Sequence, residues 1–225
     1  METKEIISQL VKGNTLFTKE HSQEYFDEFR QQQTPYITLV TCSDSRVPLQ
    51  ALMPDTSNKV FTIKNIGNQI LSTEGSVDYG IYHLKTPVLL ILGHSDCGAI
   101  RAYLKGFYEE TFNIKHELDF LRPLIKDNAS ESEFGKMHTH AIENNLDYQV
   151  NIACKKYKQL IAEGKLTVIG AYYDFANAFE KGQGRIVIVN VNKLKSENEL
   201  RAMPLFDKLS KEEKDIFIGR LKYQN

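Results

Sequence analysis

The 225-residue chain has only three cysteines, no excess of charge of either sign and no long hydrophobic run. Three cysteines without the regular spacing of a secreted disulfide framework favour a reducing compartment. The 28 basic and 29 acidic side chains give a net charge of −1, which argues against nucleic acid or an anionic membrane as a partner. No apolar stretch approaches the about 20 residues that cross a bilayer, and the first residues lack a signal-peptide core. We therefore expect a cytoplasmic protein that acts on a small molecule.

No internal repeat, low-complexity tract or change of composition divides the chain, so we expect one domain over residues 1–225. Apolar runs typical of strands alternate with helical patterns. The strands are expected at residues 36–41, 60–64, 88–92, 166–173 and 185–189. Helices are expected at residues 73–84, 99–104, 140–163 and 200–221, with a surface loop at 127–132. This alternation predicts an α/β fold with a mostly parallel central sheet flanked by helices.

A histidine and a cysteine follow the most apolar of these strands. Five aliphatic residues at 88–92 and a glycine precede His94 and Cys97, and a helical pattern begins at about residue 99. Cys97 should thus lie at a helix N-terminus, where the helix dipole and free N–H groups lower the pKa of a thiol. A thiolate and a neutral imidazole together suit Zn²⁺.

Cys42 follows another strand-like run, residues 36–41. If the sheet is parallel, the carboxyl ends of both strands lie at one edge, so Cys42, His94 and Cys97 could bind one metal ion. Two cysteines and one histidine leave the fourth tetrahedral position free, as in a catalytic zinc site. The alternative is two core cysteines and a hydrogen-bonded histidine. Agreement between two strand-end clusters favours the metal.

These segments resemble the signatures of a known family. Residues 42–47, Cys-Ser-Asp-Ser-Arg-Val, and 94–99, His-Ser-Asp-Cys-Gly-Ala, resemble the two zinc-binding signatures of the β-class carbonic anhydrases. Residues 64–68 and 75–79 resemble two further segments of that family, and the similarity extends over about residues 36–191. The resemblance implies a zinc lyase that reversibly hydrates CO₂ to bicarbonate through a zinc-bound hydroxide, with the metal ligands already named.

Asp44 and Arg46 are the expected catalytic pair. Zn²⁺ with two thiolates and one imidazole has no net charge, so its bound water ionises less readily and needs help from a neighbour. Asp44 could accept a hydrogen bond from the hydroxide, and Arg46 could keep Asp44 ionised through a bidentate pair. The alternative is a surface ion pair beside a turn. The resemblance assigns the same pair and implies that in some members the aspartate moves onto the metal.

Residues 1–30 carry apolar side chains at helical spacing but no motif. The first pattern includes Ile6, Ile7, Leu10, Val11 and Phe17, and the second includes Tyr25, Phe26 and Phe29. Such helices could pack on their own domain. The resemblance instead implies an N-terminal helical arm that covers a second subunit, in a homodimer or a dimer-based homo-oligomer.

The sequence leaves alternatives for the substrate. Relatives with the same ligands hydrolyse CS₂ or COS, and Lys64, residues 53–55 and residues 175–179 depart from the usual family pattern. We expect CO₂, because several polar residues could reach the pocket and receive a charged product. They are Asn65, Asn68, Gln69, Tyr172, Tyr173 and Asp174. His83, His116, His138 and His140 are candidate proton carriers, but none is assigned.

A different class of function would be a non-catalytic zinc protein or a redox sensor acting through Cys42 and Cys97. Asp44 and Arg46 argue against it, because a structural site needs neither residue. A nucleotide-binding protein is disfavoured, because Gly182-Gln183-Gly184 precedes a strand and does not open a helix. Cys154 falls within the expected helix 140–163 with no ligand partner nearby, which indicates a core position.

Overall fold

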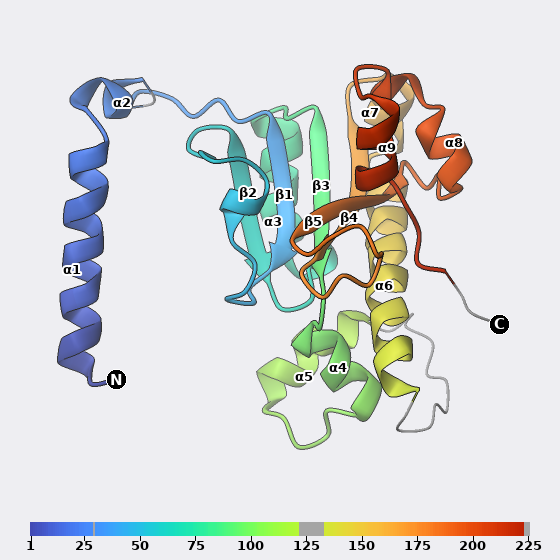
Figure 1. Cartoon of the computed structure of the whole chain (residues 1–225), viewed down its shortest axis with the longest axis horizontal. Coiled ribbons are helices and arrows are strands. Elements are labelled where there is room, and N and C mark those ends of the chain that lie inside the picture. Colours follow the sequence, from blue (N-terminus) through green and yellow to red (C-terminus); the bar gives the residue numbers. More distant parts are fainter. Residues whose placement is uncertain (29, 122–132, 223–225) are drawn as a thin grey trace. The chain divides into compact units, whose positions relative to one another are not determined.

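The computed structural model describes residues 1–28, 30–121 and 133–222 (Figure 1). Phe29 of the second helical pattern and the expected loop at 127–132 lie outside these residues. Internal contacts group the chain into two units, Met1–Thr34 and Pro35–Asn225. No helix of the described residues is long and apolar enough to span a membrane.

The first unit consists of helix α1 (Thr3–Glu20) and the short helix α2 (Gln23–Asp27). The Glu5 carboxylate accepts the Glu2 backbone N–H at 3.0 Å and thus caps the start of α1. None of the α1 side chains is buried within the unit. The large apolar side chains that stay exposed are Ile6, Ile7, Leu10, Val11, Leu16 and Phe17. The expected N-terminal helices are therefore present, with an unburied apolar face.

The second unit is built on a five-stranded sheet with the order β2-β1-β3-β4-β5. Its strands are β1 (Ile37–Cys42), β2 (Val60–Asn65), β3 (Val88–His94), β4 (Thr167–Asp174) and β5 (Arg185–Val191). The first four are parallel neighbours, and only β5 runs antiparallel, beside β4. The predicted mostly parallel α/β sheet is confirmed.

Helices cover one face of this sheet through the largest core cluster of the chain. They are α3 (Glu74–Asp78) with the π-helical turn η3 (Tyr79–His83), α4 (Gly98–Lys105), α6 (Phe134–Lys156) and α7 (Lys158–Ala162). The helix α5 (Phe112–Leu118) follows α4 and continues into η4 (Asp119–Leu121). A smaller cluster on the other face includes Leu39, Leu90 and Leu92 and packs against the turn η1 (Leu49–Ala51).

Glycines let α6 approach the middle of the sheet closely. A Cβ atom at Gly93 would lie 3.2 Å from Leu146, and one at Gly170 would lie 2.9 Å from Val150. Gly80 packs in the same way on β1, since its Cβ would lie 2.9 Å from Thr38 Cγ2. The turn η3 therefore packs closely on β1 at Gly80, whereas a Cβ at Gly75 of α3 would meet open space.

Two expected helices differ in extent. Helix α6 begins at Phe134, not at residue 140, and ends before Tyr157, whose ψ of 23° interrupts it ahead of α7. The expected helix at 200–221 is divided into α8 (Glu197–Arg201), the turn η5 (Pro204–Phe206) and α9 (Lys211–Phe217). Proline cannot continue a helix from its interior, and Ser210 caps α9 as a new start.

The segment after α9 is bound to the sheet and to α6. Ile218 pairs with Ile188 of β5, and Arg220 contacts both carboxylate oxygens of Asp147 at 3.1 and 3.0 Å. Glu143, wholly buried on α6, accepts the Leu221 N–H at 3.0 Å and lies 3.2 Å from Arg220 Nη2. Burial raises the pKa of Glu143 to about 7, despite the nearby Arg220 charge.

This raised pKa predicts that stability falls as pH rises. The ordinary glutamate pKa is 4.5, so between about pH 4.5 and pH 7 the folded chain keeps a proton on Glu143 that the unfolded chain has released. The free energy of unfolding should then decrease through this window, by roughly 3 kcal/mol at most. Glu143→Gln should remove the decrease in urea unfolding at pH 5, 6, 7 and 8. The exposed Glu212→Gln is the control, and parallel profiles for wild type and Glu143→Gln would contradict the assignment.

Candidate metal centre

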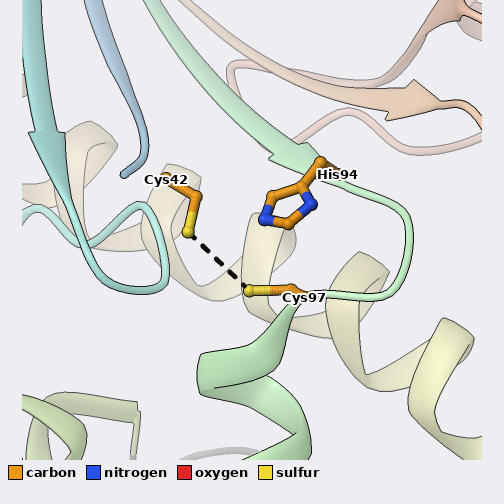
Figure 2. A group of neighbouring side chains, drawn as sticks. All are labelled: Cys42, His94 and Cys97. Carbon is orange, nitrogen blue, oxygen red and sulfur yellow. Dashed lines mark hydrogen bonds between the residues drawn. The ribbon is translucent and has the colours of Figure 1, made fainter. Parts of the chain in front are cut away.

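The two strands that pair at the centre of the sheet end at the site. Cys42 is the last residue of β1, and His94 is the last residue of β3. The parallel register pairs Thr41 with Leu92, so the two strand ends lie side by side. Cys97 follows after a short turn and caps the N-terminus of α4. Cys42 is distant in the sequence from His94 and Cys97, yet the three side chains point toward one another (Figure 2).

The potential ligand atoms of Cys42, His94 and Cys97 all lie within 4.8 Å of one another. The Sγ atoms of Cys42 and Cys97 are 4.0 Å apart. Two sulfurs bound tetrahedrally at Zn–S distances of about 2.3 Å lie about 3.8 Å apart, which agrees with this spacing. All three side chains are buried. Within the described residues, no other group of three histidine, cysteine or acidic side chains converges in this way.

The His94 ring is oriented for metal binding. Its Nδ1 atom donates to the carbonyl of Ser95 at 2.8 Å, which leaves Nε2 as the nitrogen with a free lone pair. Nε2 is buried and has no hydrogen-bond partner among the described residues. A buried nitrogen without a partner is unfavourable unless something binds it. The donor set therefore fits a metal ion, as the sequence predicts.

The two thiols differ in acidity. The Cys97 thiol donates to the Cys42 sulfur, and this bond, together with one from the Gly67 N–H, lowers the pKa of Cys42. The same pairing and its own burial raise the pKa of Cys97. The site thus offers one thiolate readily, and a bound cation would be needed to ionise the second.

Asp44 and Arg46 form the predicted pair beside this group. Arg46 Nε and Nη2 donate to the two oxygens of Asp44 at 2.9 and 2.8 Å, and the Arg46 backbone N–H adds a third bond at 2.9 Å. Hydrogen bonds from the Arg46 side chain lower the pKa of Asp44 to about 2. Asp44 Oδ2 lies 3.9 Å from His94 Nε2. An ionised carboxylate therefore lies next to the group of possible ligands and is bound by Arg46.

Two residues that the sequence motifs did not reveal contact Arg46. Asp96 accepts from Arg46 Nη1 with its carboxylate at 3.1 Å and from Nη2 with its backbone carbonyl at 3.0 Å. Asp96 also pairs with Arg101 and has a φ of 55°, a left-handed conformation that aspartate tolerates better than most residues. The ring of Phe175 lies 5.1 Å from the Arg46 guanidinium carbon. The sequence does carry a signal for Asp96, because this acidic residue stands between the possible ligands His94 and Cys97.

One of the four candidate histidines contacts the site. His138 Nε2 lies 2.9 Å from the Cys97 carbonyl and its Nδ1 lies 3.8 Å from the Asp96 carboxylate, while burial lowers its pKa. His116 lines a separate cavity of about 290 Å³ with Leu71 and Phe120. His83 packs on the Tyr79 ring, and burial lowers the pKa of His140.

Three of the polar side chains expected in the pocket form hydrogen bonds with backbone groups. The Asn65 amide donates to the Gln69 carbonyl at 2.7 Å, and the Gln69 amide donates to the carbonyls of Ile66 and Glu117. The Asp174 carboxylate accepts bonds from backbone N–H groups of its own loop. These three side chains therefore satisfy buried backbone groups, and these bonds give no support to the expectation that they receive the product. Cys154 lies in the core, as expected.

Comparisons with known proteins agree with this site. The sequence profile of the carbonic anhydrase family matches residues 37–180. A carbonic anhydrase of Helicobacter pylori strain J99 is 30% identical over 129 residues, which are 51% of this chain and 58% of that protein. A carbonic anhydrase of Synechococcus elongatus is 27% identical over 186 residues, 76% of this chain and 68% of the relative. The matched region thus spans less than two thirds of the Helicobacter protein.

The fold is shared with solved structures. Crystal structures of two tetrameric β-carbonic anhydrases from Sordaria macrospora include a chain that superposes with a TM-score of 0.67. The identity is 21%, and the superposition covers 84% of this chain and 98% of that chain. The family profile covers most of the sheet, and both signature segments lie together at the carboxyl ends of β1 and β3. The chain therefore belongs to the β-carbonic anhydrases, a family of lyase enzymes.

Proposed function

We propose that this protein is a zinc-dependent enzyme that reversibly hydrates CO₂ to bicarbonate. Cys42, His94 and Cys97 would hold the metal, and Asp44 and Arg46 would be the catalytic pair. The observation that carries the proposal is the buried Nε2 of His94, which has no hydrogen-bond partner among the described residues and lies beside two thiols and the ionised Asp44. Family membership supports CO₂ as the substrate.

Zn²⁺ bound at these residues would supply a Lewis acid that polarises water for attack on the carbon of CO₂. Asp44 accepts a hydrogen bond from that water and so orients it, because its carboxylate lies at the site and stays ionised. Arg46 keeps the carboxylate in this state through its two side-chain hydrogen bonds. The Ser95 carbonyl fixes the tautomer and the orientation of His94.

The Asp44 and Arg46 pair also separates this proposal from a non-catalytic zinc or redox role. A structural site needs closed coordination and no neighbouring ionised acid, whereas here a carboxylate held by arginine lies 3.9 Å from a ligand atom. CS₂ or COS hydrolysis would use the same ligands. No contact in the described structure favours it over CO₂, so CO₂ is the substrate we propose.

We further propose one functional domain over residues 1–225, with residues 1–30 as an arm that covers a second copy of the chain. The unburied apolar face of α1 supports this arrangement, as does the tetrameric state of the Sordaria relatives. The expected partners are then CO₂ or bicarbonate and further copies of the chain. All three cysteines are free thiols, which supports a reducing compartment such as the cytoplasm.

The metal assignment predicts about one zinc per purified chain. Cys42→Ala, His94→Ala and Cys97→Ala should each lose most of the zinc and be less stable, because metal binding contributes to folding free energy. Metal analysis after dialysis measures the zinc content. Cys154→Ala is the matched control, since it removes a buried thiol outside the site and should keep its zinc. Full occupancy in Cys97→Ala would contradict the assignment.

The catalytic pair predicts loss of activity without loss of metal. Asp44→Ala and Arg46→Ala should retain zinc but hydrate CO₂ at least about 10²-fold more slowly in stopped-flow assays. Glu74→Ala, which removes a surface ion pair with Lys156, should match the wild type. Wild-type turnover in Asp44→Ala would show that the Asp44 and Arg46 pair has only a structural role. Conversion of CS₂ to H₂S by the same zinc-loaded sample, without CO₂ hydration, would overturn the proposed substrate.

If residues 1–30 cover a second subunit, changes in α1 should alter the oligomeric state. Leu10→Asp, or deletion of residues 1–30, should shift the protein toward monomer or aggregate in light scattering, because the apolar face of α1 would lose its cover. Lys12→Asp changes a polar position of the same helix and should leave the assembly intact. An unchanged oligomer after deletion would show that the arm packs on its own subunit.

A further inference from the structure

One aromatic ring contacts both a candidate ligand and the catalytic pair. The ring of Phe175 stacks against the His94 imidazole with a centroid distance of 6.1 Å and an interplanar angle of 28°. The same ring lies 5.1 Å from the guanidinium carbon of Arg46. Phe175 is the first residue after β4 and is half-buried. It therefore lies where the two parts of the candidate site meet.

A buried carboxylate holds the segment that carries this ring. Asp174, fully buried, accepts the backbone N–H groups of Ala178 and Phe179 at 3.0 and 2.9 Å. It also accepts the hydroxyl of Ser95 at 3.0 Å, and the Ser95 oxygen in turn lies 3.2 Å from the donating N–H of Ala176. Residues 175–179 are thus tied to the residue that follows His94. No step of the proposed chemistry uses these bonds.

We propose that Phe175 is a positioning residue of this site and that the Ser95–Asp174 pair holds it in place. This inference deepens the proposed function and rests on it. The ring would fix the plane of the Arg46 guanidinium, so that its N–H groups point at the oxygens of Asp44. It would also cover one face of the His94 ring.

The geometry around Arg46 supports this role. The edge of the guanidinium donates to Asp44 on one side and to Asp96 on the other. Its central carbon lies over the Phe175 ring, where the electron-rich surface of the aromatic attracts the cation. The Arg46 side chain is still 46% exposed, so two carboxylates and water compete for its donors. A ring against the face limits how far the guanidinium can rotate out of the Asp44 plane.

The first test compares Phe175→Leu with Phe175→Tyr. Leucine keeps apolar bulk but removes the ring, so kcat for CO₂ hydration should fall about fivefold with little change in KM, while zinc is retained. Tyrosine keeps the ring and should stay within about twofold of wild type. Phe217→Leu is the matched control, because its ring lies 5.8 Å from the Arg185 guanidinium carbon, a contact of the same kind outside the proposed site. It should leave kcat unchanged.

A second readout does not depend on activity. The guanidinium carbon of Arg46 lies over the Phe175 ring, so protons of the Arg46 side chain should show upfield ring-current shifts in NMR spectra. Phe175→Leu should abolish these shifts, with or without added zinc, and Asp174→Asn should reduce them. Asp174→Asn should also lower the hydrogen-exchange protection of Ala178 and Phe179, because an amide nitrogen would face donors that now bind a carboxylate. If the protein failed to hydrate CO₂, these shifts would still test the positioning.

A double-mutant cycle tests whether Asp174 acts through the ring. If it does, Asp174→Asn combined with Phe175→Leu should lower kcat no further than the more severe single variant. Additive losses would show that Asp174 supports activity by another route, and they would overturn the proposal that Asp174 acts through the Phe175 ring. Unshifted Arg46 protons in the wild type, or wild-type kcat in zinc-loaded Phe175→Leu, would overturn the role of Phe175.

Discussion

The parallel pairing of β1 with β3 is the constraint on which the site depends. Their register places the carboxyl ends of the two strands next to each other, and Cys42 and His94 are the terminal residues. Cys97 then needs only a short turn to reach the same point from the start of α4. A shift of this register by one residue would move the two strand ends about 3.3 Å past each other and so separate the two possible ligands. The core beneath the strands therefore supports the candidate metal centre directly.

Hydrogen bonds to backbone groups and to neighbouring side chains set the orientation and the charge of the residues around the site. The Ser95 carbonyl selects the tautomer of His94, and the Gly67 N–H contacts the Cys42 sulfur. Arg46 lowers the pKa of Asp44 and is itself held by Asp96. Each charged group near the ligands thus has a partner whose position follows from the backbone. Such preorganisation lets a site orient water without first rearranging its own dipoles.

Polar residues near the site divide into two groups that look alike in sequence. Asp44 and Asp96 point to Arg46 at the site, whereas Asn65, Gln69 and Asp174 satisfy backbone groups within turns. Turns at the carboxyl ends of buried strands leave N–H and C=O groups without sheet partners, and these need buried acceptors and donors. The second group therefore supports the structure of the loops.

Local patterns in the sequence were enough to predict the strands, the mostly parallel sheet and the candidate ligands, because strand periodicity is local and the ligands stand in short motifs. It also identified Asp44 and Arg46, whose separation of two residues allows a bidentate pair within one turn. The contacts of Asp96 and Phe175 with Arg46 emerge only in the folded chain, since both residues reach Arg46 from segments distant in the sequence. Contacts between remote segments depend on register and on loop conformation, and neither leaves a periodic signal in the sequence.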